Sequence, residues 1–572
     1  MTFIKKIDYF ITQNIKIINI FLIILAILLQ THVRYTNNRM GSDQLLQISS
    51  ANSFIHGHGF SIPNASIKDL SKTKHKILTS WPPGYALLMS PLLIIINNNF
   101  VLSELILAFF GLILLFVFLY KLLLTLSNYT NKYLIPLIFL FWAFTYTPFR
   151  HLGVPDILSL SLYITTIYYS SKLILSFDDF KNKKKYLYAV VIGIIAFLCS
   201  FVRYAYYPLT LLIPLTFIGI TIFYNKKFWK IASIITIVTV GLVLLQIFST
   251  TYTQETSEMM VTGVLHLKGL LLCTGIFSNA FFADNIIFNF FLKYTGAINI
   301  PIWLFTIYSI ISLLIFIFLV IGIIQIIRKY FNSIFKTKKI NPLPLIIIFS
   351  SITILTTLLF YIFLYIQKDI NLEEFFNKNY LYKYMAIVSR YYAPIFLFTQ
   401  ICTFLFITLK PNIINNKIKS FFSLIIILAF IYNLSHWAYL RTKFSIYDRQ
   451  VNMELMNNPK ASINDFNKLQ VIFKKNKIPI VYVFNNEEQK RNFRQLNTIY
   501  YAMANGIPIL NFSNMKNTDL YSSKPIDLMI SVYKTNPNKN RLYFCKKNKA
   551  KKILSLNNID MDIYCIKIKP EE

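Results

Sequence analysis

The chain has 572 residues, of which 55% are hydrophobic and only 14% are charged. A soluble chain of this length forms several domains with charged surfaces, and about a quarter of its residues are charged, so the composition excludes a soluble enzyme, a disordered chain and a collagen-like chain. The net charge of +34 lies mostly in loops between apolar runs and in the C-terminal segment, which indicates contact with anionic lipid head groups and a membrane topology rather than nucleic-acid binding.

The apolar runs predict eleven membrane helices, because a helix needs about 20 apolar residues to cross a bilayer. The predicted ranges are 15–32, 101–125, 133–149, 157–176, 186–203, 205–224, 230–250, 301–327, 343–366, 391–410 and 421–440. Lys and Arg gather in six alternate loops, which places these loops and the N-terminus in the cytoplasm. The long segments and the tail then lie outside, so we expect an all-α polytopic membrane protein with its chemistry on the extracytoplasmic face.

The first outer loop, residues 33–100, begins with a predicted amphipathic helix that lies on the membrane surface. One face of this helix carries Leu45, Ile48, Asn52 and Ile55. Asp43 lies at its start, and Gly57 is suited to end it. Two interpretations of Asp43 stay open: it caps the helix, as Asp often does, or it is a general base that the helix dipole keeps ionised.

The same loop ends in Trp81-Pro82-Pro83-Gly84-Tyr85, which predicts a rigid turn that leads into a helix. Taken alone, this turn anchors the loop to the bilayer. The combination of the acidic helix start with this turn is far more specific than either segment.

Together these segments resemble the GT-C superfamily of integral-membrane glycosyltransferases. The resemblance rests on an acidic residue after the first span, on the pattern A-x-S-F-x-x-G-x-G-F at residues 51–60, and on W-P-P-G-Y-x-L-L at residues 81–88. It is strongest to the bacterial branch related to protein O-mannosyltransferases and lipid A aminoarabinose or galacturonic acid transferases. Many members carry Asp-Glu at the first site, whereas this chain has Asp43-Gln44.

The resemblance implies further site residues. Asp156, in the turn that enters the fourth span, is a second carboxylate of the outer cavity, with a helix cap as the alternative. Arg203, in Ser200-Phe201-Val202-Arg203-Tyr204, and Arg390, in Ser389-Arg390-Tyr391, match the family's boundary arginines. Such an arginine either clamps a phosphate or only anchors a helix at the interface. By the same resemblance, the substrate-binding loop contains His58, Trp81, Pro83 and Tyr85.

Metal binding is left open by the sequence. His56 and His58 are separated by one glycine, but no Cys or nearby acid completes a zinc set. Some relatives in the wider superfamily need a divalent metal, so a cofactor is neither assigned nor excluded.

The tail, residues 441–572, is predicted to be a small extracytoplasmic α/β domain that follows a membrane domain of residues 1–440. Its predicted strands are Ile478–Phe484, Ile526–Val532, Arg541–Cys545 and Met561–Ile568. Cys545 and Cys565 either form a disulfide in an oxidising compartment or are buried free thiols. No glycine-rich phosphate loop follows any of these strands, so we expect a docking or scaffolding role for this domain.

The resemblance implies an inverting transferase of the cytoplasmic membrane, which moves a sugar from a polyprenyl-phosphate donor to a glycan, lipid or protein acceptor. Asp43 is then the base, Asp156 orients a substrate, and Arg390 with Arg203 binds the donor phosphate. Two alternatives remain. A transporter or flippase of lipid-linked glycans predicts charges in the middle of several spans, and a non-enzymatic scaffold would not need these residues to converge.

Overall fold

The structure is a computed structural model, and the chain in it divides into two compact units. The helical unit comprises residues 1–33, 107–252 and 258–442, and the sheet unit comprises residues 34–106, 253–257 and 443–572. The structure describes all residues except 1–2, 37–41, 67, 79–80, 146–152, 252–274, 283–301, 336–339, 366–391, 448–467, 470, 474–477, 485–501, 503, 512–520, 534–538, 557–560 and 571–572.

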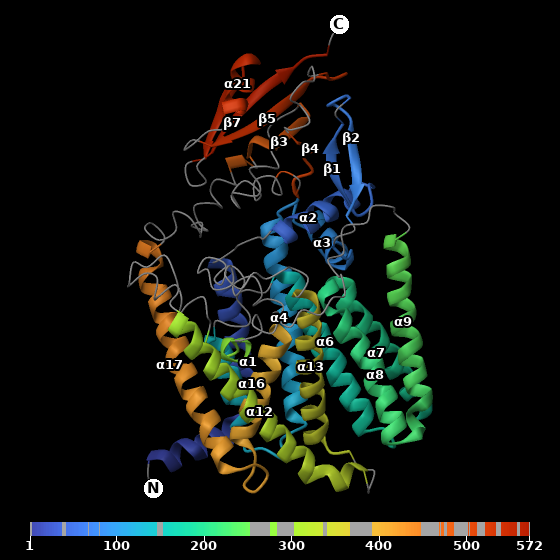
Figure 1. Cartoon of the computed structure of the whole chain (residues 1–572), viewed down its shortest axis with the longest axis vertical. Coiled ribbons are helices and arrows are strands. Elements are labelled where there is room, and N and C mark those ends of the chain that lie inside the picture. The colour runs from blue at the N-terminus through green and yellow to red at the C-terminus, as the bar shows by residue number, and fades with distance from the viewer. Residues whose placement is uncertain are drawn as a thin grey trace. The chain divides into compact units, whose positions relative to one another are not determined.

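The helical unit is a bundle of long apolar helices (Figure 1). Its helices are α1 (Phe3–Thr36), α4 (Phe100–Leu124), α5 (Leu134–Phe144), α6 (Val154–Leu175), α7 (Asn182–Val202), α8 (Tyr207–Phe223), α9 (Trp229–Thr251), α10 (Ile276–Asn279), α12 (Ile302–Phe335), α13 (Pro342–Tyr365), α16 (Ala393–Thr408) and α17 (Asn416–Tyr447). Each of the eleven predicted spans contains one of these helices.

Among the described residues, eight helices are long and apolar enough to cross a membrane. They are α1, α4, α7, α8, α9, α12, α13 and α17, whereas α5 and α16 are apolar but shorter. α6 has 22 residues, but six of them are Ser or Thr, which lowers its hydropathy. The chain is therefore a multi-pass membrane protein, and the number of eleven spans stays a prediction.

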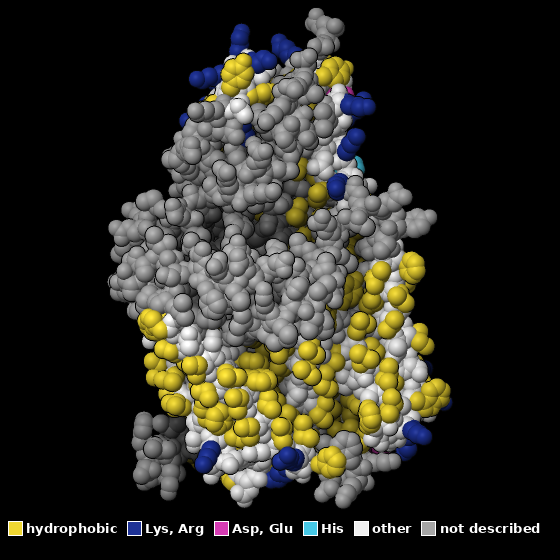
Figure 2. Space-filling model, viewed as in Figure 1, with side chains coloured by type: hydrophobic (Ala, Val, Ile, Leu, Met, Phe, Trp, Pro, Cys, Tyr) yellow, Lys and Arg dark blue, Asp and Glu magenta, His cyan; other side chains and the backbone are white. Residues whose placement is uncertain are grey.

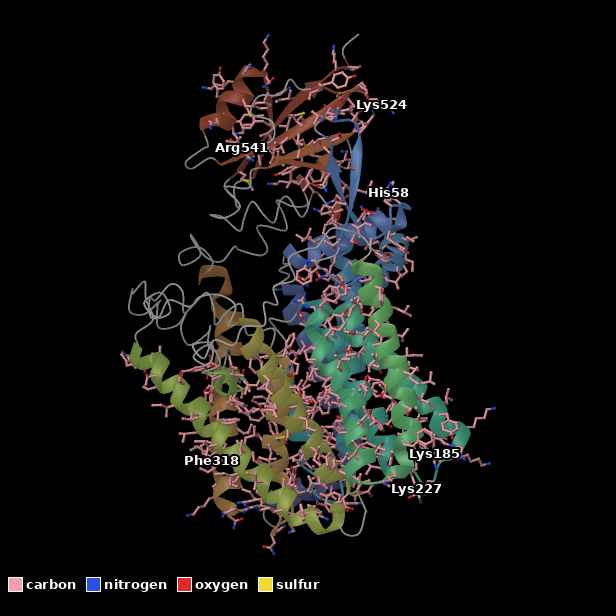
Figure 3. The ribbon with its side chains drawn as sticks, turned by 45° about the vertical axis from the view of Figure 1, so that its right-hand side comes forward. His58, Lys185, Lys227, Phe318, Lys524 and Arg541 are labelled. Carbon is pink, nitrogen blue, oxygen red and sulfur yellow. The ribbon has the colours of Figure 1, made fainter. Side chains whose placement is uncertain are left out.

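The surface of the helical unit matches a lipid environment. Large side chains such as Ile237, Leu245 and Phe248 are more than two-thirds exposed, and Figure 2 shows such residues as a wide apolar band with Lys and Arg below it. Lys185, at the start of α7, and Lys227, before α9, lie at the same end of the bundle (Figure 3). Water would penalise such a band, whereas lipid does not.

A buried chain of polar contacts holds the inner helices together. Gln30 on α1 donates to the carbonyl of Trp142 at 2.7 Å, and the Trp142 indole donates to Oε1 of Gln400 on α16 at 2.8 Å. Nε2 of Gln400 in turn donates to the carbonyl of Ala280, just after α10. Irregular backbone inside a membrane protein must be satisfied by protein groups, so these bonds hold α10, which comes from the predicted outer loop 251–300, inside the bundle.

The sheet unit joins the first loop to the tail. Its first-loop elements are α2 (Ser42–Ile55), β1 (Ser61–Ala65), β2 (Thr73–Ile77) and α3 (Gly84–Ile95). Its tail elements are β3 (Ile480–Phe484), β4 (Ile509–Asn511), β5 (Ile526–Tyr533), α21 (Lys539–Lys547), β6 (Lys551–Leu556) and β7 (Met561–Ile568). The seven strands form one sheet in the order β2-β1-β4-β3-β5-β7-β6.

Loop and tail meet between the second and third strands of this sheet, β1 and β4. β1 pairs with β2 in antiparallel fashion and with β4 in parallel through Asn64 and Ile509. Ala65 and Leu70 of the first loop belong to the same hydrophobic core as Val483 and Leu528 of the tail. The sequence placed the first loop in a domain of residues 1–440, whereas the structure groups residues 34–106 with the tail.

Two predictions about local structure were wrong. α2 does not present its apolar face to lipid, because Leu45 and Ile48 are at most 2% exposed and pack within the sheet unit. Residues Arg541–Cys545 form part of the helix α21 instead of a strand (Figure 3 labels Arg541). The two buried side chains there, Arg541 and Cys545, are four residues apart, which is the spacing of a helix face.

Cys545 and Cys565 are free thiols. Both are buried, and burial raises the pKa of each thiol to about 11. The two cysteines therefore contribute packing on α21 and β7 and stay protonated at neutral pH.

Candidate functional site

The helix α2 begins with Ser42 and Asp43. The first amide groups of a helix have no partners within the helix, and they carry the positive end of its dipole. A carboxylate there is favoured in its ionised form, as the general-base interpretation of Asp43 requires. The backbone of Asp43 lies in the first turn of α2, and its side chain lies outside the described residues.

The next residue, Gln44, contacts a buried acid. Its Nε2 donates a hydrogen bond of 2.6 Å to Oε1 of Glu104 on α4, and the two residues are 8% and 5% exposed. Glu104 was missed by the sequence analysis. The signal was present, because an acidic residue within a predicted span is costly and commonly functional, but Glu104 lies close to the end of its predicted span, 101–125.

The turn after α2 explains the G-x-G pattern. Gly57 and Gly59 have φ values of 79° and 64°, a left-handed conformation that side chains disfavour. His58 between them is exposed, and its ring stacks on that of His75 on β2 with centroids 3.8 Å apart (Figure 3 labels His58). Partial burial, together with the positive charge of His58, lowers the pKa of His75.

The second motif packs against the first. Pro83 precedes α3 and Tyr85 in its first turn is fully buried, while Trp81 is half-buried. Ser90 on α3 donates to the carbonyl of Ala51 on α2 at 3.4 Å. The segments of residues 42–60 and 81–91 therefore form one structure with Glu104 of α4.

Asp156 and Arg203 form an ion pair in the helical unit. The carboxylate of Asp156 lies 2.9 Å from Nε of Arg203, within ion-pair distance, and it accepts a hydrogen bond from the backbone amide of Gly153 at 3.2 Å. The side chains of Arg203 and Asp156 are 3% and 5% exposed. Asp156 thus caps α6, which was the alternative to a catalytic role, and it also positions the Arg203 guanidinium at the end of α7.

The structure does not test whether the remaining predicted site residues lie close together. Arg390 lies outside the described residues, and Asp43 and Asp156 belong to different units. The convergence of Asp43, Asp156 and Arg390 on one outer cavity stays a prediction.

A metal has no evident ligand set in the described part of the chain. No group of three or more His, Cys, Asp or Glu residues is arranged there to hold one. His58 and His75 face each other ring to ring, which does not point two nitrogens at a shared ion, and no step is therefore assigned to a metal.

Comparisons with known proteins give structural similarities only. No protein-family model matches the chain, and no curated protein matches it. The structure is similar to that of ArnT from Cupriavidus metallidurans in the apo state, with a TM-score of 0.48, 8% identity, and coverage of 96% of this chain and 97% of that one. ArnT bound to undecaprenyl phosphate gives a TM-score of 0.45 at 9% identity, with the same coverage.

A third similarity is to the archaeal oligosaccharyltransferase AglB from Archaeoglobus fulgidus, in complex with an inhibitory peptide and a dolichol-phosphate. Its TM-score is 0.43 at 10% identity, and the match covers 90% of this chain and 70% of that chain. Identities of 8 to 10% assign no activity, so a function for this chain has to be argued from its own residues.

Proposed function

We propose that the chain is a glycosyltransferase that moves a sugar from a polyprenyl-phosphate donor to a hydroxyl group of a glycan, lipid or protein acceptor. The reaction takes place on the outer face of the cytoplasmic membrane and inverts the anomeric centre. The observation that carries the proposal is the packing of α2, with Asp43 in its first turn, against α3, whose first turn contains the end of the Trp81–Tyr85 motif. The two segments that resemble a transferase are distant in sequence but belong to one structure.

The contacts of Asp156 favour the other carboxylate, Asp43, as the base. Asp156 has one oxygen beside Arg203 and the other on the amide of Gly153, so both of its oxygens are already engaged within the protein. Asp43 is therefore the proposed general base. It takes the proton of the acceptor hydroxyl while the hydroxyl oxygen attacks the anomeric carbon.

The leaving group determines the role of the cations. As the new glycosidic bond forms, the bond between the anomeric carbon and the phosphate oxygen breaks, and polyprenyl phosphate leaves with both electrons of that bond. Fixed positive groups stabilise the charge that grows on this phosphate. We assign this task to Arg390, with Arg203 beside the Asp156 carboxylate in support. The polyprenyl tail needs only apolar surface between membrane helices.

The proposal is tested by Asp43→Asn. Asn caps a helix about as well as Asp, so this change keeps a cap and removes a base. We expect turnover of a lipid-linked sugar donor to fall on the order of 10²-fold or more, with unchanged expression and melting. Asp179→Asn, which changes an exposed acid in the turn after α6, is the matched control and should retain full activity. Near-normal transfer by Asp43→Asn would leave Asp43 as a cap only.

A further inference from the structure

Glu104 holds the first turn of α2 from a neighbouring helix. Its side chain is buried, and its carboxylate accepts the 2.6 Å hydrogen bond from Gln44, 60 residues earlier in the chain. A buried carboxylate is costly unless it is hydrogen-bonded, and a bond to a charged acceptor is shorter and stronger than a neutral one. The amide of Gln44 and the carboxylate of Glu104 are therefore matched partners.

This bond fixes the residue next to the proposed base. Gln44 and Asp43 are consecutive in the first turn of α2, so a contact that holds Gln44 also holds the backbone of Asp43. The C-terminal half of α2 is held separately, because Ala51 accepts a hydrogen bond from Ser90 and Asn52 donates to the carbonyl of Ala504 at 3.4 Å. Gln44 and Glu104 thus hold the end of α2 at which Asp43 lies.

We propose that Glu104 is a positioning residue of the transferase, which acts through Gln44 to orient Asp43. The inference rests on the proposed function, in which Asp43 is the base. Glu104 itself does not touch the substrate in this account. A second consequence is that residue 44 must be a hydrogen-bond donor as long as residue 104 is a carboxylate.

Exchanging the amide and the carboxylate between residues 44 and 104 tests this pair. Gln44→Glu sets two carboxylates against each other and should displace the first turn of α2, so we expect kcat to fall on the order of 10²-fold, as misplaced catalytic groups do, with KM nearly unchanged. Glu104→Gln leaves two amides that can still bond and should cost only a few-fold. In the double variant Gln44→Glu/Glu104→Gln, donor and acceptor are exchanged, and kcat should return to within a few-fold of wild type.

Asn52→Asp is the matched control. It also converts a buried amide of α2 into a carboxylate, but it lies eight residues, or about 12 Å, further along the helix. Glu104→Gln should rescue Gln44→Glu and should not rescue Asn52→Asp. A double variant as impaired as Gln44→Glu, or a loss of kcat that only follows the folded fraction, would overturn the positioning role.

Amide hydrogen exchange, which does not depend on enzymatic activity, separates this inference from the proposed function. The amides of residues 46–48 donate to the carbonyls of residues 42–44 in the first turns of α2, so their hydrogen exchange reports whether this turn is held. We expect faster exchange in Gln44→Glu and normal exchange in the double variant, whether or not sugar is transferred. Normal exchange in Gln44→Glu contradicts the positioning role. If exchange instead returns to normal in the double variant while Asp43→Asn still transfers sugar at the wild-type rate, only the assignment of Asp43 as the base is contradicted.

Discussion

The two arginines that we propose for the donor phosphate differ in the evidence for each. Arg203 is paired with Asp156 in a buried contact, whereas Arg390 was assigned from the Arg-Tyr-x-x-Pro pattern alone. Arg390→Lys should lower turnover roughly tenfold, because a point charge replaces a planar fork that binds two phosphate oxygens at once. Steady-state kinetics with a lipid-linked donor measure the loss. Arg328→Lys, at an exposed position of α12, is the control, and equal loss in both variants would contradict a specific role.

Asp69 links the first loop to the tail by hydrogen bonds. Its two carboxylate oxygens accept from the amide of Ser523 at 3.0 Å and from the Ser523 hydroxyl at 2.7 Å, and Ser71 donates to it as well. These bonds, those from Ser523 first, hold the pKa of Asp69 well below its usual range. A carboxylate with a lowered pKa in the folded state stabilises the protein above its unfolded pKa, and the contribution is lost as the pH falls below that value.

Asp69→Asn should therefore lower the melting temperature at pH 7, and the difference from wild type should shrink as the pH is lowered through about 4. Thermal unfolding in detergent between pH 7 and pH 3 measures this. Asp179→Asn, which removes an exposed acid in the helical unit, should show no such trend. A difference that stays constant with pH would mean that the charge of Asp69 is not what links the two segments.

Two helix glycines differ in whether a neighbouring helix leaves room for a side chain. A Cβ on Gly322 of α12 would lie 2.7 Å from the Phe406 ring on α16, whereas a Cβ on Gly241 of α9 would have nothing within 4 Å. Overpacking costs about 1–3 kcal/mol, and Ala gains about 1 kcal/mol over Gly within a helix. Gly322→Ala should therefore destabilise the protein by up to about 2 kcal/mol, and Gly241→Ala should stabilise it slightly. Unfolding in detergent with denaturant measures both, and equal signs would contradict this packing.

The sequence predicts best those elements that have a long apolar run. Each predicted span contains a helix, because runs of about 20 apolar residues have few alternatives. The short run Arg541–Cys545 was assigned wrongly, since four or five apolar residues fit a strand or a helix equally well. β1 and β2 were missed because six of their ten residues are polar, and because β1 pairs with a strand of the tail.

At the scale of the molecule, the topology is the prediction with the most consequences. Lys and Arg in six alternate loops place residues 441–572 outside. Tyr543→Cys, at a side chain that is 70% exposed on α21, should react with a membrane-impermeant maleimide in intact cells. Lys183→Cys, at the start of α7, should react only after permeabilisation. The reverse pattern would place the sheet unit and the first loop in the cytoplasm and remove the outer-face site.

The candidate site was predicted in part for the same reason. Asp43 at a helix start and the Gly57–Phe60 turn follow from local residue chemistry, and both appear in the structure. The contact of Gln44 with Glu104 and the pairing of Asp156 with Arg203 each join residues that are far apart in the sequence and that helix packing brings together. Such contacts leave no local pattern, so a single sequence indicates which residues are unusual but not which partners they meet.

The parallel pairing of β1 with β4 also sets an order of events during synthesis. Roughly 440 residues separate Ala65 from Ile509, and a ribosome adds roughly 5–20 residues per second. The hairpin of the first loop is thus made some 20–90 s before its neighbouring strand exists, by the same rate. During that interval one edge of β1 is open to other unpaired strands, so premature termination within the tail yields a chain that is prone to aggregate outside the bilayer even when all its membrane helices have inserted.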